Sequence, residues 1–270
     1  MILDEIAART RTRVARAKKK VTLEEMKIRA LSIVEEETEY GKKPYVSYPF
    51  RDALAKGGIS FICEVKKASP SKGIIAEDFP YVEIAVDYEQ AGASAISVLT
   101  EPFYFKGSND YLREISNNVS IPVIRKDFTV DEYMIYEAKT LRANAVLLIC
   151  AILDDGQLRA YLKLAHSLGM SALVEAHDEA EVKRAISCGA GIIGVNNRNL
   201  KDFTVDINNS ARYRRMVPDD VIFVSESGIK TAEDIKALVD NGTDAVLIGE
   251  TLMRSNDKKA KLDELRSLCR

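Results

Sequence analysis

The sequence contains no tryptophan, only two histidines and four cysteines among 270 residues. The cysteines, Cys63, Cys150, Cys188 and Cys269, are widely separated and form no Cys-x-x-Cys pair. This spacing excludes a cysteine zinc site and a disulfide framework and favours buried thiols in a reducing compartment. Two histidines cannot build a His-rich metal centre. Acid–base chemistry near neutral pH must therefore fall mainly to lysines and carboxylates with shifted pKa values.

Long apolar runs and a strong net charge are also lacking. The longest apolar stretches, such as residues 143–153, are too short to span a membrane. The formal net charge of -2 and the pI of about 5.9 give no global preference for nucleic acid or for an anionic membrane. The first residues lack the basic region and apolar core of a signal peptide, so we expect a cytoplasmic protein.

Residues 1–57 differ from the rest of the chain. Residues 3–20 have helical spacing with an Arg- and Lys-rich face, and Thr22 with Glu25 forms a capping-box pattern that begins a second helix. The basic run at residues 9–20 is typical of a solvated helix face, with a nucleic-acid patch as the alternative. We expect a helical extension over residues 1–57 and one catalytic domain over residues 58–270.

From Ser60 onward, strand and helix patterns alternate. The predicted strands are residues 60–66, 95–99, 122–126, 145–149, 172–175, 192–196, 221–225 and 245–248. Helix start signals recur between them at Asp131, Asp154, Asp178 and Thr231, and glycines that suit helix C-caps follow at 92, 169, 189 and 242. Eight strands, each followed by a helix, predict a (β/α)8 TIM barrel, an α/β fold. A doubly wound open sheet usually has fewer strands and a Gly-x-Gly-x-x-Gly turn, which is absent here.

Polar residues occur where strand after strand ends, which is where active sites of this fold lie. The candidates from these ends are Glu64, Lys66, Lys126, Glu175, Asn196, Glu226 and Ser227. Glu64 and Lys66 share one face of the first strand because they are two residues apart. Lysines and glutamates that lie together at one mouth should shift each other's pKa values. Partial burial is expected to lower the pKa of the lysines and to raise that of the glutamates.

Three further groups of residues predict how a ligand would be held. Gly228 with Ile229, and Gly249 with Glu250, follow the last two strands, the usual phosphate site of this fold, where Glu250 is expected to offer only its backbone N–H. Phe128 and the apolar fourth strand, represented by Leu148, suit a flat aromatic group. Arg198 is a candidate for binding a carboxylate of the ligand. Ser69, Pro70 and Ser71 lie in the loop after the first strand and are expected to close the mouth.

The motifs resemble those of the indole-3-glycerol-phosphate synthase family. The first is Glu64-Val-Lys66-Lys-Ala-Ser69-Pro70-Ser71-Lys-Gly73. The others are Leu99-Thr-Glu-x-x-Tyr-Phe-x-Gly107, Arg125-Lys-Asp-Phe128, Leu173-Val-Glu175, Ile193-Gly-Val-Asn196-Asn-Arg198-Asn-Leu200, Ser225-Glu-Ser-Gly228 and Leu247-Ile-Gly249. The resemblance covers the barrel from about residue 50 onward and also implies N-terminal helices lying over the barrel mouth.

The resemblance implies a carboxy-lyase of tryptophan biosynthesis. Its substrate would be 1-(2-carboxyphenylamino)-1-deoxyribulose 5-phosphate, closed to indole-3-glycerol phosphate with loss of carbon dioxide and water, without a metal or organic cofactor. By this likeness Lys126 polarises or protonates the carbonyl and Glu175 is the base of dehydration. Glu64 and Lys66 tune and orient these groups, and Lys66 is the alternative candidate for an acid role. Asn196 and Ser227 support the reacting centre. Arg198 and Ser69 bind the anthranilate carboxylate, and Leu200 joins the substrate-binding residues.

Two alternatives remain at this point. Another phosphate-binding barrel, such as a phosphoribosyl isomerase, would share the phosphate end but should carry an Asp or Cys pair at the mouth. A non-catalytic barrel would use the basic run at residues 9–20 to bind a partner or RNA, with steep salt dependence and no turnover. The family likeness predicts a small phosphorylated substrate, no nucleic-acid or membrane partner, and a monomer or weak homodimer.

Overall fold

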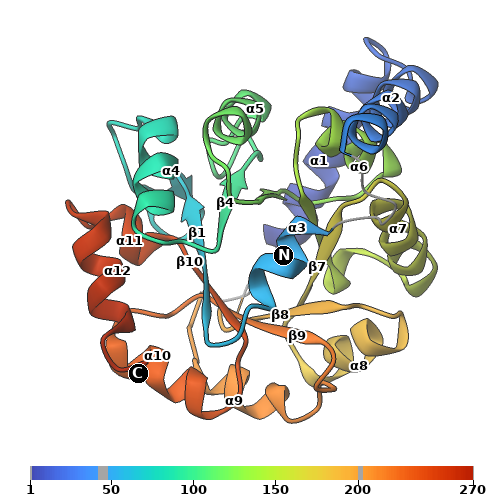
Figure 1. Ribbon diagram of the computed structural model, residues 1–270. Helices are drawn as coiled ribbons and strands as arrows, with labels where there is room; N and C mark the ends of the chain where they lie inside the picture. The colour runs from blue at the N-terminus through green and yellow to red at the C-terminus, as the bar shows by residue number, and fades with distance from the viewer. Residues whose placement is uncertain (1, 42–47, 200–202, 270) are drawn as a thin grey trace.

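A computed structural model describes residues 2–41, 48–199 and 203–269 of the protein (Figure 1). Its centre is a closed barrel of parallel strands in the order β1-β10-β9-β8-β7-β6-β5-β4. These strands are β1 (Ser60–Val65), β4 (Ala95–Leu99), β5 (Val123–Lys126), β6 (Ala145–Ile149), β7 (Ser171–Ala176), β8 (Ile192–Asn196), β9 (Ile222–Glu226) and β10 (Ala245–Ile248). A small antiparallel pair, β2 (Ala68–Ser69) and β3 (Gly73–Ile74), follows β1. The predicted TIM barrel is confirmed, with strand ends within two residues of those expected.

Helices surround the barrel in the alternating order that the sequence predicts (Figure 1). They are α4 (Tyr81–Gln90), α5 (Asn109–Asn118), α6 (Glu132–Thr140), α7 (Asp155–Ser167), α8 (Glu179–Ser187), α9 (Asn208–Arg214), α10 (Ala232–Asp240) and α12 (Lys258–Arg266). The side chains of Asp131, Asp154, Asp178 and Thr231 each accept a backbone N–H as N-caps. The turn η1 (Cys150–Ile152) and the short helix α11 (Glu250–Met253) are additions that the periodicity did not predict.

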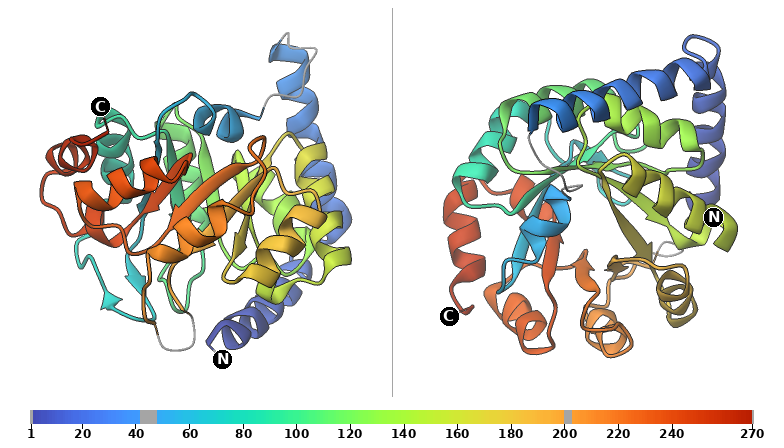
Figure 2. Two further views of the ribbon diagram at one scale, coloured as in Figure 1. Left: turned by 90° about the horizontal axis from the view of Figure 1, so that it is seen from below. Right: turned by 45° about the vertical axis from the view of Figure 1, so that its right-hand side comes forward.

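Three helices precede the barrel and lie on different sides of it. Helix α1 (Ile2–Lys18) begins at the barrel mouth, α2 (Leu23–Gly41) packs along α6, and α3 (Pro49–Leu54) lies at the opposite end (Figure 2). Phe50 and Leu54 of α3 are buried in the barrel interior beneath the strands. The Thr22–Glu25 capping box is present, since each backbone N–H donates to the other residue's side chain. Among the described residues of the extension, those of α1 alone reach the mouth, so the expectation of N-terminal helices over the mouth holds for α1 and not for α2 or α3.

The barrel interior is a packed apolar layer below the mouth. Its inward side chains are mainly Ile, Leu, Val and Ala: Ile62, Ala95, Ile124, Ala145, Leu147, Ile149, Leu173, Ile192, Ile222, Val224, Ala245 and Leu247. A second apolar cluster lies between strands and helices. Among the described residues no helix is both long and apolar enough to cross a lipid bilayer.

Gly107 ends the tight loop after β4, and a side chain there has no room. A Cβ atom on Gly107 would lie 2.3 Å from Leu99 O and 2.8 Å from Thr100 N, both backbone atoms that cannot swing aside. We expect Gly107→Ala to lower the free energy of unfolding by about 2–3 kcal/mol, the usual cost of overpacking. Thermal and urea unfolding would measure it. Gly191→Ala is the matched control because nothing lies within 4 Å of its Cβ position; equal melting temperatures would contradict the prediction.

Candidate active site

A cavity of about 600 Å³ opens at the carboxyl ends of the barrel strands. It is lined by nearly all the residues that the sequence singled out. These are Glu64, Lys66, Ser69, Pro70, Ser71, Lys126, Phe128, Glu175, Asn196, Arg198, Glu226, Ser227, Gly228, Ile229, Gly249 and Glu250. Leu200 lies outside the described residues, and Leu148 lies outside the cavity.

Strand alternation explains why the charged residues face the cavity. Side chains two residues apart on a strand share a face, so each polar residue lies one step above an interior apolar one. Lys126 follows Ile124 in this way, Glu175 follows Leu173, and Glu226 follows Val224, with each apolar partner in the interior layer. The barrel floor is thus apolar, while the layer above it carries charges.

Lys126 lies between two glutamates on that layer. Its Nζ donates to Glu175 Oε2 at 3.1 Å and lies 3.4 Å from Glu226 Oε2. All three side chains are largely buried, with exposed fractions of 13%, 4% and 2%. The Oε1 atom of Glu226 has no hydrogen-bond partner among the residues that the structure describes, and it lies next to Gly194, where a Cβ atom would be 2.1 Å from it. The absence of a side chain at Gly194 therefore leaves room for Glu226.

Glu64 and Lys66 form a second ion pair, as their shared strand face predicts. Lys66 Nζ lies 2.7 Å from Glu64 Oε1, and Ser97 donates to Glu64 Oε2 at 3.2 Å. Gly249 lies against this pair, because a Cβ atom there would be 2.6 Å from Glu64 Oε1 and 2.8 Å from Lys66 Nζ. The pair and the segment after β10 are therefore in direct contact.

The pKa shifts at this site differ from the sequence-based expectation. Burial disfavours the charged form of Lys126, but Glu175, Glu226 and Glu64 outweigh it and raise the pKa of the lysine. Burial also opposes ionisation of Glu175 and Glu64, yet neighbouring cations hold the pKa of each carboxyl below its usual range. Of the three glutamates only Glu226 has a raised pKa, about 7, because burial and the other two carboxylates together outweigh the attraction of Lys126. For Lys126 the expectation of a lowered pKa was wrong because three carboxylates surround its ammonium group.

The apolar wall of the cavity comes from β6, but not from the residue predicted. Leu147 and Ile149 line the cavity, whereas Leu148 points outward into the cluster between strands and helices. Assigning Leu148 to the pocket was therefore wrong, since alternation places it on the opposite face of the strand. Phe128 lines the cavity as predicted, and its ring packs against that of Phe105, with centroids 6.0 Å apart.

The segments after β9 and β10 approach the cavity with their backbones. Ser227 and Gly228 have consecutive positive φ angles of 68° and 87°. A left-handed conformation is uncommon for serine, and such outliers concentrate at functional sites. The Glu250 side chain pairs with two cations: its Oε1 lies 3.2 Å from Arg254 Nε and 3.9 Å from Lys72 Nζ. Its carboxylate charge is thus partly neutralised beside the cavity.

Arg198 and Ser69 lie on two segments that flank the mouth. Arg198 follows β8, and its backbone N–H donates to Asn196 Oδ1 at 3.0 Å. Asn196 in turn donates to Glu175 Oε1 at 3.3 Å. Ser69 belongs to the β2–β3 pair above β1. A guanidinium, an amide and a hydroxyl therefore all line the same cavity.

Several residues at the site were missed by sequence reasoning. Ile2, Leu3 and Ile6 of α1 line the cavity, but their helical pattern does not say which part of the barrel they cover. His177 contacts Glu175, with 3.2 Å between Nε2 and Oε1. Its position two residues after Glu175 was a usable signal, the same one that paired Glu64 with Lys66.

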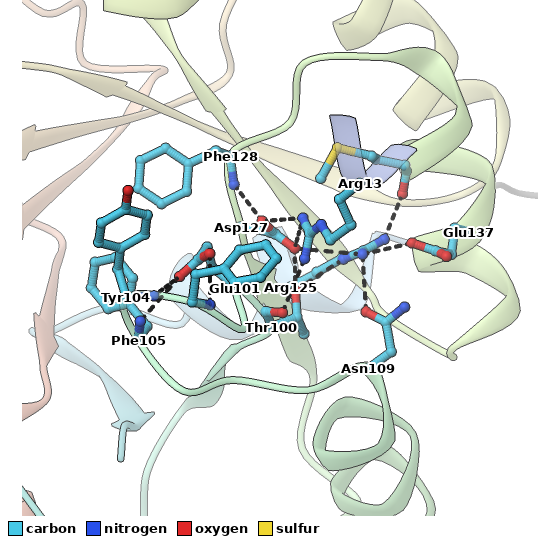
Figure 3. A network of polar contacts seen from close by, with 12 residues as sticks. Arg13, Thr100, Glu101, Tyr104, Phe105, Asn109, Arg125, Asp127, Phe128 and Glu137 are labelled. Atoms are coloured by element: carbon cyan, nitrogen blue, oxygen red, sulfur yellow. Dashed lines mark hydrogen bonds and ion pairs between the residues drawn. The ribbon is translucent and has the colours of Figure 1, made fainter. Parts of the chain in front are cut away.

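The basic run of α1 is more than a solvated face, because two of its cations pair with the barrel. Figure 3 shows Arg13 reaching Asp127, which follows Lys126 in the chain. Arg13 Nη2 donates to both carboxylate oxygens of Asp127, at 2.7 and 2.8 Å. Thr100 Oγ1 and the Phe128 N–H also donate to this buried carboxylate. Lys18 forms the second pair, 2.7 Å from Asp131.

Arg125 extends this network away from the cavity. Its guanidinium donates to Asn109, Glu137 and the Met134 carbonyl (Figure 3). Despite burial, Arg13 and Arg125 hold the pKa of Asp127 below its usual range. A carboxylate with a lowered pKa stabilises the fold above its unfolded-state pKa, and this contribution is lost as the pH falls through the folded-state pKa.

Removing Arg13 should therefore destabilise the protein in a pH-dependent way. Arg13→Met leaves the buried Asp127 carboxylate without its bidentate partner, at an expected cost of about 1–3 kcal/mol at pH 7. A value below that of a fully buried pair is expected because the Arg13 side chain is 23% exposed. Melting temperatures of the wild type and of Arg13→Met at pH 7 and at about pH 4 would test this. The difference between the two proteins should be smaller at the lower pH, because Asp127 becomes protonated in the variant. Arg16→Met, on the exposed face of the same helix, is the control and should leave the melting temperature unchanged at both pH values.

Comparison with known proteins identifies the family. Residues 3–265 match the family model described as indole-3-glycerol phosphate synthase. An indole-3-glycerol phosphate synthase of Ruminiclostridium cellulolyticum is 58% identical over 266 residues, covering 98% of this chain and 99% of that protein. The enzyme of the same name from Lacticaseibacillus paracasei is 55% identical over 260 residues, covering 96% of both chains.

Solved structures at low identity show the same fold. The thiamine phosphate pyrophosphorylase of Pyrococcus furiosus has a TM-score of 0.60 at 15% identity, covering 81% of this chain and 96% of that one. The 3-hexulose-6-phosphate synthase of Salmonella typhimurium has a TM-score of 0.65 at 12% identity, covering 78% of this chain and 98% of that one. The motifs, the barrel and the full-length matches agree. The chain belongs to the indole-3-glycerol phosphate synthase family, whose members are carboxy-lyases of tryptophan biosynthesis.

Proposed function

We propose that the cavity closes 1-(2-carboxyphenylamino)-1-deoxyribulose 5-phosphate to indole-3-glycerol phosphate, with release of carbon dioxide and water. The observation that carries this proposal is the Lys126 ammonium between Glu175 and Glu226, in the charged layer of a cavity with an apolar wall. The reaction needs a cation at a carbonyl oxygen and a base near the carbon that loses its proton, and these groups supply both.

The two ends of the cavity suit the two ends of this substrate. The phosphate would lie against the backbone N–H groups after β9 and β10, where Ser227 and Gly228 adopt left-handed conformations. The anthranilate ring would lie against Phe128 and the β6 wall, with its carboxylate near Arg198 and Ser69. The ribulose carbonyl then falls between the two ends, over Lys126.

Lys126 would act in ring closure. As the anthranilate ring carbon bonds to the ribulose carbonyl carbon, electron density moves to the carbonyl oxygen. The Lys126 ammonium stabilises this oxygen and donates a proton to it, which leaves a hydroxyl group. The carboxylate on the attacking carbon then departs as carbon dioxide, and its bonding electrons return to the ring. Lys66, held by Glu64, and Ser227 would orient the substrate during these steps.

Glu175 would act in dehydration. Cations hold its pKa low, so it is ionised at neutral pH and able to accept a proton. It removes the proton from the carbon next to the new hydroxyl group, and the hydroxyl leaves as water with a proton that Lys126, neutral after ring closure, has taken back from solvent. Asn196 would keep the Glu175 carboxylate in place through its 3.3 Å hydrogen bond. Indole aromaticity drives the step to completion.

The direct test is incubation of the purified protein with the carboxyphenylamino ribulose phosphate. Indole fluorescence should appear, and one carbon dioxide should be released for each indole formed. A folded protein that binds this substrate without producing indole would contradict the proposal. The isomerase alternative is tested in parallel with a phosphoribosyl aminoaldose, which should not be converted.

We also propose that residues 1–57 are an extension packed on one catalytic domain, residues 58–270, in a cytoplasmic protein that is a monomer or a weak homodimer. Three free cysteines are buried, which suits a reducing compartment. Light scattering across a concentration series tests the oligomeric state, and a single tight dimer at all concentrations would contradict it.

A further inference from the structure

His177 is a buried histidine held between two carboxylates, one of which belongs to the active site. It directly follows β7, and its side chain is 16% exposed. Its Nε2 lies 3.2 Å from Glu175 Oε1 and its Nδ1 lies 3.1 Å from Glu181 Oε2. The approach to Glu175 is close enough for an ion pair, although its alignment falls short of a hydrogen bond. His177 is not among the residues that line the cavity, so it contacts Glu175 without lining the cavity itself.

Glu181 fixes the histidine from the side away from the cavity. It lies in the first turn of α8, where the Asp178 side chain accepts its backbone N–H as N-cap. One oxygen, Oε2, accepts the backbone N–H of His177 at 2.8 Å and also faces the ring nitrogen. Backbone and ring of His177 are therefore held by the same carboxylate, which limits how the ring can turn.

The contact adds a third partner to the Glu175 carboxylate. Lys126 contacts Oε2, while Asn196 and His177 both approach Oε1. Without His177, Oε1 would keep one long hydrogen bond from an amide. A carboxylate that must take a proton from a defined carbon depends on its orientation, and misplacement by about 1 Å can cost roughly 100-fold in rate.

We propose that His177 is a positioning residue for Glu175, with its ring cation holding Oε1 in place and Glu181 holding the ring. This inference rests on the proposed role of Glu175 as the base of dehydration. The pair Glu181–His177 then forms an outer support for the catalytic carboxylate, built from the strand that carries Glu175 and the helix that follows it.

The charges around the ring support a cationic histidine at neutral pH. Burial disfavours the charged form, but the close contacts and negative charges of Glu175 and Glu181 raise the pKa of His177 to about 10. Other titratable or charged groups lie near these carboxylates: Glu226 of β9 interacts with Glu175, and Arg184 of α8 with Glu181. Lys126 of β5 contacts Glu175, and Cys150 of η1 donates to the Glu181 carbonyl. The Cys150 pKa is raised to about 12 by burial, so this thiol stays neutral.

The test compares His177→Ala and His177→Gln with the wild type. His177→Ala should lower kcat by about 10–100-fold with KM changed less than about twofold, because the contact orients a base and does not bind substrate. His177→Gln should recover part of kcat, since its amide can donate near the Nε2 position. In both variants the acid limb of the kcat/KM profile should move to higher pH, because loss of the cation raises the Glu175 pKa. The matched control is His166→Gln, which replaces the other histidine, on α7. It should leave kcat, KM and the pH profile unchanged.

Two further variants make each outcome decisive. Glu181→Gln keeps an acceptor for the His177 N–H and should shift the acid limb in the same direction by a smaller amount. If His177→Ala does not fold, an unchanged profile in Glu181→Gln overturns the proposal. Unchanged kcat and pH profile in a folded His177→Ala variant also overturn it, even if its melting temperature falls. If Glu175→Gln itself turns over normally, the base assignment has failed, which is a different result.

Discussion

Replacing Lys126 with methionine should lower kcat by about 10²–10⁴-fold, the usual size of general acid catalysis. Methionine keeps the length and apolar stem of the lysine but removes its charge. The variant should still bind substrate, because the phosphate and anthranilate ends of the cavity are separate from this side chain. Isothermal titration for binding and indole fluorescence for turnover would separate the two effects.

Lys66→Met is the matched comparison, since the same substitution is made on the neighbouring lysine. Lys66 pairs with Glu64 at the cavity wall and contacts the segment after β10, so its loss should raise KM as well as reduce kcat. A folded Lys126→Met variant with near-normal turnover, together with an inactive Lys66→Met variant, would transfer the acid role to Lys66.

The raised pKa of Lys126 changes how its role is understood. A lysine with a lowered pKa would exchange protons freely near neutral pH, but Lys126 is held charged by the carboxylates around it. Its main contribution is therefore a fixed positive charge under the carbonyl oxygen, with proton transfer following as that oxygen becomes basic. The group able to titrate near neutral pH is Glu226, with a pKa of about 7.

Most site residues were predicted from the alternation of side chains between the two faces of a strand. This alternation could not show which face of a fully apolar strand points into the cavity. Glu64, Lys126, Glu175 and Glu226 could be assigned to the mouth because a charge inside a buried strand is costly unless it is used. In β6 every residue is apolar, so nothing in the sequence distinguishes the inward Leu147 from the outward Leu148. Neighbouring strands settle that choice through the barrel register.

Contacts between distant parts of the chain were beyond sequence reasoning for a different reason. Arg13 and Asp127 are separated by 114 positions, and neither position alone indicates the other. The basic run therefore looked like a solvated face, although Arg13 and Lys18 attach α1 to the barrel. Likewise the sequence did not reveal which side chains of α1 line the cavity. By contrast, helix caps were predicted well because they depend on only a few adjacent residues.

Glu175→Gln should slow the last step of the reaction, dehydration, much more than the steps before it. The amide keeps the shape of the carboxylate and can still accept hydrogen bonds, but it cannot remove a proton from carbon. Indole formation should fall by about 10²–10⁴-fold, as expected for loss of a general base. Ring closure and decarboxylation depend on Lys126, so carbon dioxide release should be reduced far less.

A single-turnover experiment that follows both products decides this. In the wild type, carbon dioxide and indole should appear in equal amounts, and in Glu175→Gln a burst of carbon dioxide should precede any indole. In Lys126→Met both products should be suppressed together, because ring closure itself is blocked. If Glu175→Gln slows carbon dioxide release and indole formation equally, the carboxylate acts at or before decarboxylation. Its 3.1 Å contact with Lys126 would then be its main function, since it would serve to hold the charged lysine under the carbonyl oxygen.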